Sequence, residues 1–481
     1  MLFNSLTYLV LLFSTVFLFW NFTYQLRFYL IFASSLVFYG FWRIEFIILL
    51  LFSATINWWI AILIEKNFKM MKKKFLLLSL FINLGILFYF KYSIFFSNNG
   101  IGLLNLFGAE IDPILFKVIL PLGISFYTFQ AISYTIDVYR KIIKPEKSYI
   151  VYACYITFFP QLVAGPILRA HEVILQFKKK IFFRWDYIID GSRRVLYGLF
   201  LKVVIADNIA PFVDMGFGSS ANMLSGLDVW TLAFLFGFQI YFDFSGYSHI
   251  AIGSAKMIGI SFPENFNFPY LASSPKDFWG RWHISLSSWV RDYIYLPLSG
   301  VKFMNNSIGG LSSVTSGQKD YMPLFITWSL MGLWHGANWT FVLWGIYHAI
   351  LIFIYRKILI INYKFKLKIN NLVGWFFTIP LIMLSWVPFR SDSIKDTFIM
   401  WGKIVNPFNY NNLNLHSNIY LITFLLFIGV IITYIFKKKI KKKIIAGTGV
   451  TLIGDIILIS FLFYTTFISF KSINQFIYFQ F

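Results

Sequence analysis

Residues 322–355 read MPLFITWSLMGLWHGANWTFVLWGIYHAILIFIY, an apolar stretch without Asp, Glu, Lys or Arg. Basic residues flank it on both sides: Lys256, Lys276, Arg281, Arg291 and Lys302 before it, and Arg356, Lys357, Lys364, Lys366 and Lys368 after it. Because basic loops stay in the cytoplasm, a single crossing does not fit this pattern. The stretch is long enough for two short helices that dip into the bilayer and return. We therefore expect a hairpin that turns at 336–338 and places His335 at its tip.

His335 is the candidate functional residue of this hairpin. An ionisable side chain at membrane depth is costly, so it is a functional-site hypothesis by default. The alternative is structural, since a buried histidine can donate a hydrogen bond to a carbonyl and stiffen a helix bundle. The residues alone leave both interpretations open.

The composition indicates an integral membrane protein. Of the 481 residues, 58% are hydrophobic and only 13% are charged, whereas about a quarter of a soluble domain is charged. The mean hydropathy is +0.69. The formal charge of +22 comes from short lysine clusters between apolar runs, which fits cytoplasmic loops facing anionic lipids and excludes a nucleic-acid partner. The lone Cys154 excludes an internal disulfide and a thiolate metal cluster.

The apolar runs predict an all-α polytopic protein with about ten transmembrane helices plus re-entrant segments. Candidate spans cover 2–20, 26–42, 44–64, 75–96, 114–138, 195–213, 229–250, 371–390, 419–436 and 445–468. The first run lacks the features of a cleaved signal peptide and is expected to be retained. Five lysines between 66 and 74 place the loop after the third span in the cytoplasm, so we expect an extracytoplasmic N-terminus.

A second apolar stretch, 149–167, also has basic flanks at both ends. Its segment FFPQLVAGP at 158–166 contains two prolines and a glycine, which break a helix midway. Broken backbone at membrane depth persists only where protein or water satisfies its polar groups. We therefore expect this stretch to be re-entrant as well.

Between these stretches lie two segments with polar side chains in aromatic surroundings. Residues 278–293, FWGRWHISLSSWVRDY, read either as an interfacial helix with arginines on lipid phosphates or as part of a site around His283. Asp243 lies inside an apolar span and costs several kcal/mol if unpaired, so a partner should exist. Ion coupling is the alternative interpretation of Asp243.

Five segments together resemble the membrane-bound O-acyltransferase family, and most closely its bacterial branch that acetylates alginate and peptidoglycan. They are PLGISFYTFQAISYTIDVYR (121–140), FFPQLVAGPI (158–167), QIYFDFSGYSHIAIGSAKMIGISFPENFNFPY (239–270), FWGRWHISLSSWVRDYIYLPLSG (278–300) and WHGANWTFVLWG (334–345). They cover about a third of the chain, in the order that the family shows.

The resemblance implies that His335 is the active-site histidine and that His283 matches a second position, held by His or Asn in other members. It further implies one transmembrane domain over 1–481, with N-terminal spans to 138, a core over 139–355 and C-terminal spans from 356, thinned centrally into a funnel. His348 matches no family site and is interpreted as structural.

Acyl transfer from a thioester needs a base for the incoming hydroxyl, and a neutral histidine suits that task. His335 would be the base, while His283 would orient the donor carbonyl or hold a proton for the leaving thiolate. Ser285 and Asn338 are candidate hydrogen-bond donors. No serine nucleophile motif is present, and two histidines without a neighbouring carboxylate make a weak metal site, so we expect neither a metal nor a bound cofactor.

The expected donor is cytosolic acetyl-CoA, whose phosphates would meet Arg281, Arg291 or nearby lysines. The resemblance also implies residence in a bacterial cytoplasmic membrane and a separate extracytoplasmic, esterase-like partner that completes transfer to a polysaccharide. Two alternatives stay open. One is D-alanyl transfer to teichoic acid. The other is a non-enzymatic transporter, which Asp243 and the re-entrant stretches would favour.

Overall fold

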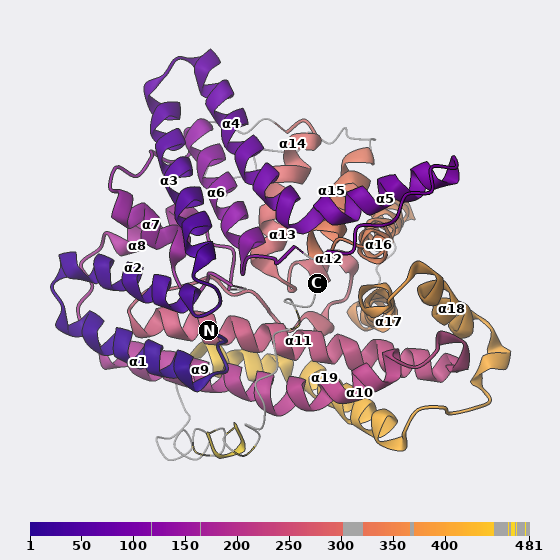
Figure 1. Ribbon diagram of the computed structural model, residues 1–481. Coiled ribbons are helices and arrows are strands. Elements are labelled where there is room, and N and C mark those ends of the chain that lie inside the picture. Colours follow the sequence, from indigo (N-terminus) through magenta and orange to yellow (C-terminus); the bar gives the residue numbers. More distant parts are fainter. Residues whose placement is uncertain are drawn as a thin grey trace. The chain divides into compact units, whose positions relative to one another are not determined.

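The computed structural model describes residues 1–116, 118–163, 165–301, 321–365 and 370–446, together with 460, 463–466, 468 and 477. These residues form helices and loops, and no β-strand occurs among them (Figure 1). Seven of the described helices or continuous helical runs are long and apolar enough to cross a membrane. An all-α polytopic membrane protein, as the sequence predicts, is therefore confirmed. The predicted span 445–468 lies almost wholly outside the described residues.

The chain divides into two compact units. The first unit comprises Met1–Val195, Ile250–Pro263 and Arg291–Lys319, and the second comprises Leu196–His249, Glu264–Val290 and Asp320–Phe481. Helices α9 (Trp185–Leu199) and α11 (Gly226–Met257) contribute residues to both units.

The first unit is built mainly from the N-terminal helices. They are α1 (Leu6–Asn21), α2 (Tyr24–Gly40), α3 (Glu45–Lys66), α4 (Lys69–Leu87), α5 (Ser93–Leu106), α6 (Ile124–Tyr139), α7 (Tyr149–Thr157) and α8 (Ala170–Phe177). Helices α3, α4 and α6 lie side by side (Figure 1). A buried amide pair joins α3 to α4, where Asn83 Nδ2 donates to Asn57 Oδ1 at 2.8 Å. Such a bond satisfies polar groups that lipid could not.

Two predictions about this unit have different outcomes. The stretch 149–167 is indeed broken, because α7 ends at Thr157 and a turn precedes α8; the freed Phe159 N–H donates to Ser35 Oγ at 3.1 Å. The predicted span 114–138 is wrong at its start, since α6 begins only at Ile124. Pro121 and Gly123 keep the preceding apolar residues out of the helix, because proline breaks a helix and Gly123 takes a left-handed φ of 68°.

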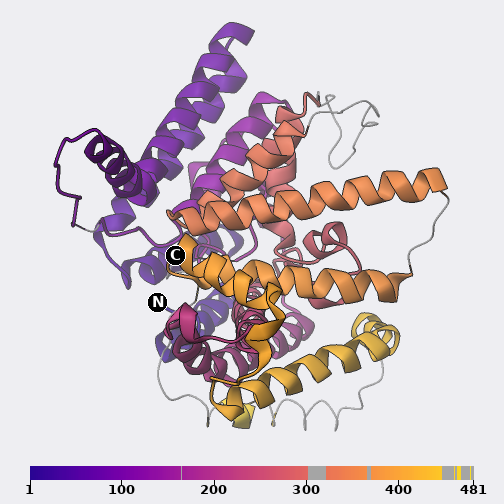
Figure 2. The ribbon, with the colours of Figure 1, turned by 90° about the vertical axis from the view of Figure 1, so that its right-hand side faces the viewer.

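The second unit holds most of the remaining helices. They are α10 (Asp207–Phe217), α12 (Pro275–Trp279), α13 (Ile284–Val290), α15 (Met322–His335), α16 (Trp339–Phe365), α17 (Asn371–Arg390), α18 (Ile394–Val405) and α19 (Ser417–Ala446). Figure 2 shows α16 and α17 as neighbouring orange helices, and the two pack against each other.

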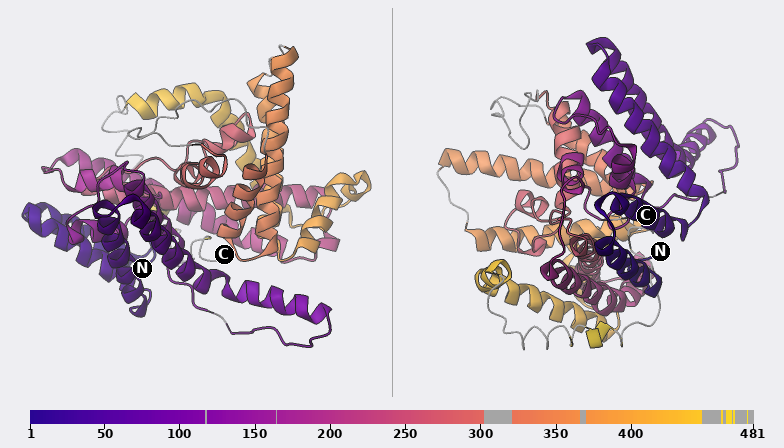
Figure 3. Two further views of the ribbon diagram at one scale, coloured as in Figure 1. Left: turned by 90° about the horizontal axis from the view of Figure 1, so that it is seen from above. Right: turned by 90° about the vertical axis from the view of Figure 1, so that its left-hand side faces the viewer.

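Helices α15 and α16 form the predicted hairpin, with its turn after His335 (Figure 3). Their close approach depends on glycine: a Cβ at Gly332 would lie 2.1 Å from the carbonyl oxygen of Phe341, and one at Gly345 equally close to that of Trp328. The expectation of two short helices is wrong for the second, because α16 has 27 residues and is long enough to cross a membrane.

Three π-helical segments interrupt the α-helical pattern of the described residues. They are η1 (Phe88–Tyr92), η2 (Phe200–Ala206) and η5 (Arg291–Tyr295). Segments of this kind insert an extra residue into a helix and often occur at functional positions. Here η2 joins α9 to α10 without a break, and η5 continues from α13.

Candidate active site

His335 is the last residue of α15, in the second unit, and its side chain is buried. Three aromatic rings surround the imidazole. The ring centroids of Trp334 and Trp344 each lie 4.9 Å from it, and that of Phe389 lies at 5.2 Å. The hairpin thus holds His335 at its tip, as expected, among side chains that exclude water.

His283 lies immediately before α13, in the same unit, and is fully buried. Its φ of 42° is left-handed, a conformation that non-glycine residues seldom adopt and that clusters at functional sites. The Phe244 ring packs perpendicular to the imidazole at a centroid distance of 4.5 Å. The Trp334 centroid lies 6.4 Å away, so this indole stands close to both candidate histidines.

A buried amide supports His283 from the loop after α11. The Oδ1 atom of Asn265 lies 3.1 Å from His283 Nδ1 and accepts the hydroxyl of Ser285 at 2.9 Å. Burial lowers the pKa of His283 to about 3, so its ring is neutral at physiological pH. The sequence does not single out Asn265, although the residue stands in the FPENFNFPY segment that carries the family resemblance.

Ser285 therefore lies with His283, whereas Asn338 and Arg281 have local structural contacts. Asn338 Oδ1 accepts the Thr340 N–H at 3.1 Å and so caps the start of α16. Arg281 Nε pairs with Asp277 Oδ1 at 2.7 Å, and its Nη1 donates to the carbonyl of Asn267 at 3.3 Å. These contacts leave the predicted roles of both residues as predictions.

A third buried histidine, His348, lies one helical turn beyond Trp344 on α16. Its ring centroid is 4.7 Å from Trp344 and 5.0 Å from Trp279, while Trp328 stacks on it at 5.4 Å. Trp344 thus contacts both His335 and His348. The sequence gives no sign of this aromatic packing beyond the density of tryptophans.

Asp243 has the partner that the sequence requires. Its Oδ1 lies 2.6 Å from Nζ of Lys202 in η2, and its Oδ2 accepts the backbone N–H of Ile477 at 3.0 Å. Lys202 also pairs with Asp207 Oδ1 at 2.7 Å. Asp243 is thus an element of a buried ion network, and these contacts tie it to Lys202 and the backbone rather than to the histidines.

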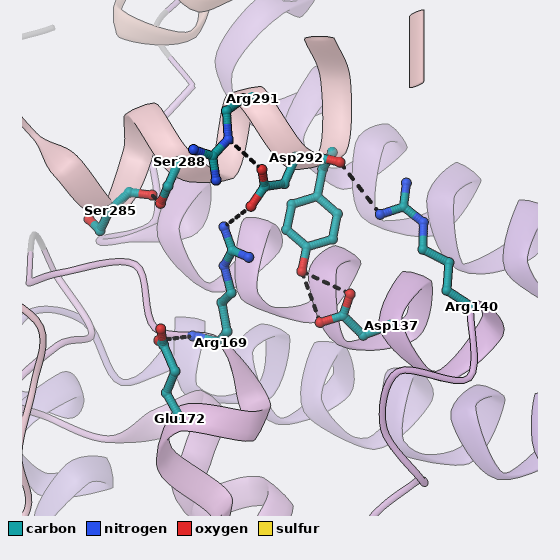
Figure 4. Close-up of polar contacts among 9 residues, drawn as sticks. Asp137, Arg140, Arg169, Glu172, Ser285, Ser288, Arg291 and Asp292 are labelled. Atoms are coloured by element: carbon teal, nitrogen blue, oxygen red, sulfur yellow. Dashed lines mark hydrogen bonds and ion pairs between the residues drawn. The ribbon is translucent and has the colours of Figure 1, made fainter. Parts of the chain in front are cut away.

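Arg291 belongs to the first unit, where arginines gather around Asp292 (Figure 4). Arg291 Nε lies 2.6 Å from Asp292 Oδ1, and Arg169 Nη2 lies 2.5 Å from Oδ2. Arg140 donates to the Asp292 carbonyl at 3.4 Å. The sequence does not predict Arg140 and Arg169, because their approach depends on contacts between residues more than 120 positions apart.

The Arg291 guanidinium is about half exposed, with 52% of its side chain accessible. Next to Asp292, Tyr293 donates its hydroxyl to both carboxylate oxygens of Asp137 at 2.9 Å. The described residues hold no group of three His, Cys, Asp or Glu side chains that could bind a metal ion.

Comparison with known proteins identifies what the chain is similar to. A family model described as MBOAT, membrane-bound O-acyltransferase family, matches residues 143–389, which include both candidate histidines. The chain is 38% identical over 375 residues to "Probable alginate O-acetylase AlgI" of Azotobacter vinelandii, covering 78% of this chain and 71% of that protein.

Two further relatives extend the comparison. The "Peptidoglycan O-acetyltransferase" of Helicobacter pylori is 36% identical over 389 residues, covering 75% of this chain and 70% of the relative. The "Teichoic acid D-alanyltransferase" of Bacillus subtilis is 30% identical over 256 residues, covering 52% and 62% respectively. The likeness to the acetyltransferases is thus both greater in identity and longer.

Proposed function

The chain belongs to the membrane-bound O-acyltransferase family and is an O-acyltransferase, and from that premise we propose that it is a membrane O-acetyltransferase subunit. In this proposal, it moves an acetyl group from cytosolic acetyl-CoA for O-acetylation of an extracytoplasmic polysaccharide, an alginate-like exopolysaccharide or peptidoglycan. The observation that carries the proposal is the placement of His335 and His283 next to the one indole of Trp334.

His335 is the proposed base. It takes the proton from an acceptor hydroxyl while the hydroxyl oxygen attacks the thioester carbonyl of acetyl-CoA. The new C–O bond forms, the C–S bond breaks, and the proton passes to the thiolate of CoA. General-base catalysis of this kind contributes roughly 10²–10⁴-fold to a rate. The aromatic side chains that enclose His335 support this role, because they hold the imidazole in a fixed place at the tip of the hairpin.

The donor's phosphates require cations, and Arg291 is the best-placed predicted residue. Its half-exposed guanidinium, backed by Arg169 on the same carboxylate, could exchange part of its pairing with Asp292 for phosphate oxygens. Arg281, paired with Asp277, is the second candidate.

The proposed setting is a bacterial cytoplasmic membrane with the N-terminus outside. The lysines between 66 and 74 support that orientation. The two histidines would line a funnel through which the acetyl group leaves outward. An esterase-like extracytoplasmic partner would then receive it and acetylate the polymer.

D-alanyl transfer is the alternative within this enzyme class, and the similarity to the Bacillus subtilis protein favours keeping it. The two reactions differ in their donor. Acetyl transfer consumes acetyl-CoA and releases CoA, whereas the alternative would depend on a carrier protein that bears the acyl group.

The proposal is tested with purified protein in liposomes. Acetyl-CoA is supplied with a soluble glycan acceptor and the extracytoplasmic partner, and free CoA and glycan acetyl esters are measured. We expect wild-type protein to release CoA, His335→Ala to lose about 100-fold or more of that rate, and His416→Ala, outside the candidate site, to keep it. Normal acetylation by a well-folded His335→Ala variant would overturn the role of His335. Turnover with an aminoacylated carrier protein alone would favour the alternative.

A further inference from the structure

Asn265 lies at the centre of a small polar network that is otherwise enclosed by aromatic side chains. Its own side chain is 1% exposed. Its Nδ2 donates to Ser248 Oγ of α11 at 3.2 Å. Its Oδ1 accepts two bonds from Ser285, from the hydroxyl at 2.9 Å and from the backbone N–H at 3.3 Å. The same Oδ1 faces His283 Nδ1 at 3.1 Å.

This network decides which nitrogen of His283 carries the proton. A backbone N–H can only donate, so the atom that receives it from Ser285 must be the amide oxygen of Asn265. An oxygen of this kind cannot donate to the ring, so His283 Nδ1 must be the donor. A neutral imidazole has one N–H, and Nε2 therefore holds the lone pair.

From this arrangement we infer that Asn265 is a positioning residue: it locks His283 in the Nδ1–H tautomer, so that Nε2 is the atom that accepts a proton during acyl transfer. The inference rests on the proposed function and gives His283 a specific role within it. His335 serves the acceptor hydroxyl, and Nε2 of His283 holds the proton on its way to the CoA thiolate.

The backbone around His283 supports a fixed ring. The Ile284 N–H donates to the Asn265 carbonyl at 3.0 Å, and Asn267 N–H donates to the Arg281 carbonyl at 2.9 Å, so the two segments are tied on both sides of the histidine. The left-handed φ of His283 lies between these ties. Turning the imidazole over would lose its hydrogen bond to Asn265. The Phe244 ring also packs perpendicular to the imidazole in its present orientation.

The surroundings of the ring contribute little charge. Helix α11 presents Phe244 to His283 and α15 presents Trp334, and neither titrates. The charged neighbours along the chain are Glu264, next to Asn265, and Arg281, whose guanidinium is paired with Asp277. A charge introduced at position 265 would therefore act directly on His283.

The tautomer can be read without any enzyme assay. Protein labelled with ¹⁵N only at histidine is reconstituted in lipid and examined by solid-state magnetic resonance at neutral pH, and His283→Asn identifies the His283 signals by their loss. We expect a protonated Nδ1 and an unprotonated Nε2. A protonated Nε2 with a bare Nδ1 overturns the inference, whatever reaction the protein performs.

The role in transfer is tested by changing residue 265. Asn265→Asp keeps oxygen acceptors for Ser285 and His283 but adds a negative charge. An opposite charge within hydrogen-bond reach raises a histidine pKa by about one to three units. The raised pKa keeps His283 protonated to higher pH, so we expect the acid limb of the rate profile to move up by a similar amount. Asn83→Asp, a buried asparagine of the first unit, is the matched control and should leave the limb in place.

Asn265→Ala removes the lock altogether. We expect a kcat about 10- to 100-fold lower, the range seen when the outer partners of metal-binding histidines are removed, and partial rescue by Asn265→Asp at alkaline pH. If the alanine variant fails to fold, the inference is still tested by the pH profile of Asn265→Asp and by the tautomer of His283 in the wild type. An unchanged pH profile in folded Asn265→Asp overturns the inference. Absence of acetyl transfer in the wild type would instead overturn the proposed function.

Discussion

Lys202 and Asp243 form an ion pair inside membrane-spanning helices, with 2.6 Å between Nζ and Oδ1 and both side chains buried. Lys202 joins a second carboxylate, that of Asp207, at 2.7 Å. The one lysine thus serves two acids, and each acid shares it with the other. Removing Lys202 should therefore destabilise the protein more than removing the charge of Asp243.

We expect Lys202→Met to destabilise the protein by about 3–5 kcal/mol, the cost of breaking a buried ion pair from one side. Asp243→Asn should cost less, because Lys202 keeps Asp207 and the new amide oxygen can still accept from Ile477. Unfolding in detergent, followed by circular dichroism, measures both variants. Arg184→Met removes an exposed pair and should leave stability nearly unchanged. Equal stability of Lys202→Met and wild type would contradict the prediction.

The hairpin that carries His335 depends on small side chains. Gly332→Ala would place a methyl group 2.1 Å from the Phe341 carbonyl oxygen, so α15 and α16 must separate. We expect a loss of about 1–3 kcal/mol, typical of overpacking, and a reduced kcat because His335 moves with the end of α15. Gly402→Ala is the control, since a Cβ there meets nothing within 4 Å and alanine favours a helix. Gly332→Ala with unchanged stability and kcat would show that the helices adjust freely.

Arg291 should act on donor binding rather than on chemistry. Arg291→Ala removes charge-assisted hydrogen bonds to the donor phosphates, so we expect KM for acetyl-CoA to rise about tenfold with little change in kcat. Initial rates at varied acetyl-CoA concentration measure the effect. The KM of the wild type should also depend more steeply on salt concentration than the KM of the variant. Arg184→Ala, an exposed arginine paired locally with Asp186, is the control. A fall in kcat alone would assign Arg291 to another step.

The buried His283 should make the protein less stable in acid. Its pKa is lowered to about 3 in the fold, below its unfolded value near 6.5. Between these values the unfolded chain binds one more proton at this residue than the folded protein does. Stability therefore falls as pH decreases from about 6.5 towards 3.

The His283→Asn variant isolates this effect, because asparagine does not titrate and still offers a polar side chain to Asn265. We expect the difference in unfolding temperature between wild type and variant to shift in favour of the variant as pH falls through this window. Thermal unfolding from about pH 7 to about pH 4 measures it. Parallel curves for the two proteins would mean that His283 titrates normally in the fold.

The hairpin and the need for a partner at Asp243 were predictable from the sequence, because each follows from the free-energy cost of placing a charged group in the membrane. Charge on both flanks of 322–355 excludes a single crossing, and a carboxylate inside a span demands a partner. Both predictions can be made without knowledge of which distant segments of the chain are in contact. The partner itself could not be predicted in this way, since Lys202 is 41 positions away from Asp243 and lies in a π-helical segment.

The rest of the candidate site depends on contacts between distant segments. Asn265 reaches His283 across 18 positions through an irregular loop that has no helical or strand periodicity. Arg169 reaches Asp292 across 123 positions. Hydropathy also misplaced the start of α6, because it counts apolar side chains without regard to the backbone that Pro121 and Gly123 impose. Sequence patterns therefore locate the histidines but not the residues that hold them.

The π-helical segment η2 has a consequence for how this protein tolerates deletions. A residue inserted into an α-helix turns everything beyond it by about 100° around the axis, since a full turn takes 3.6 residues. Removing one residue from Phe200–Ala206 would restore regular α-helical pairing and leave Asp207 close to its present direction, because the wide π-helical turn takes up the extra residue locally. A residue removed from the regular turns of α9 would not be absorbed in this way, and it would turn Lys202 by about 100° relative to the start of α9.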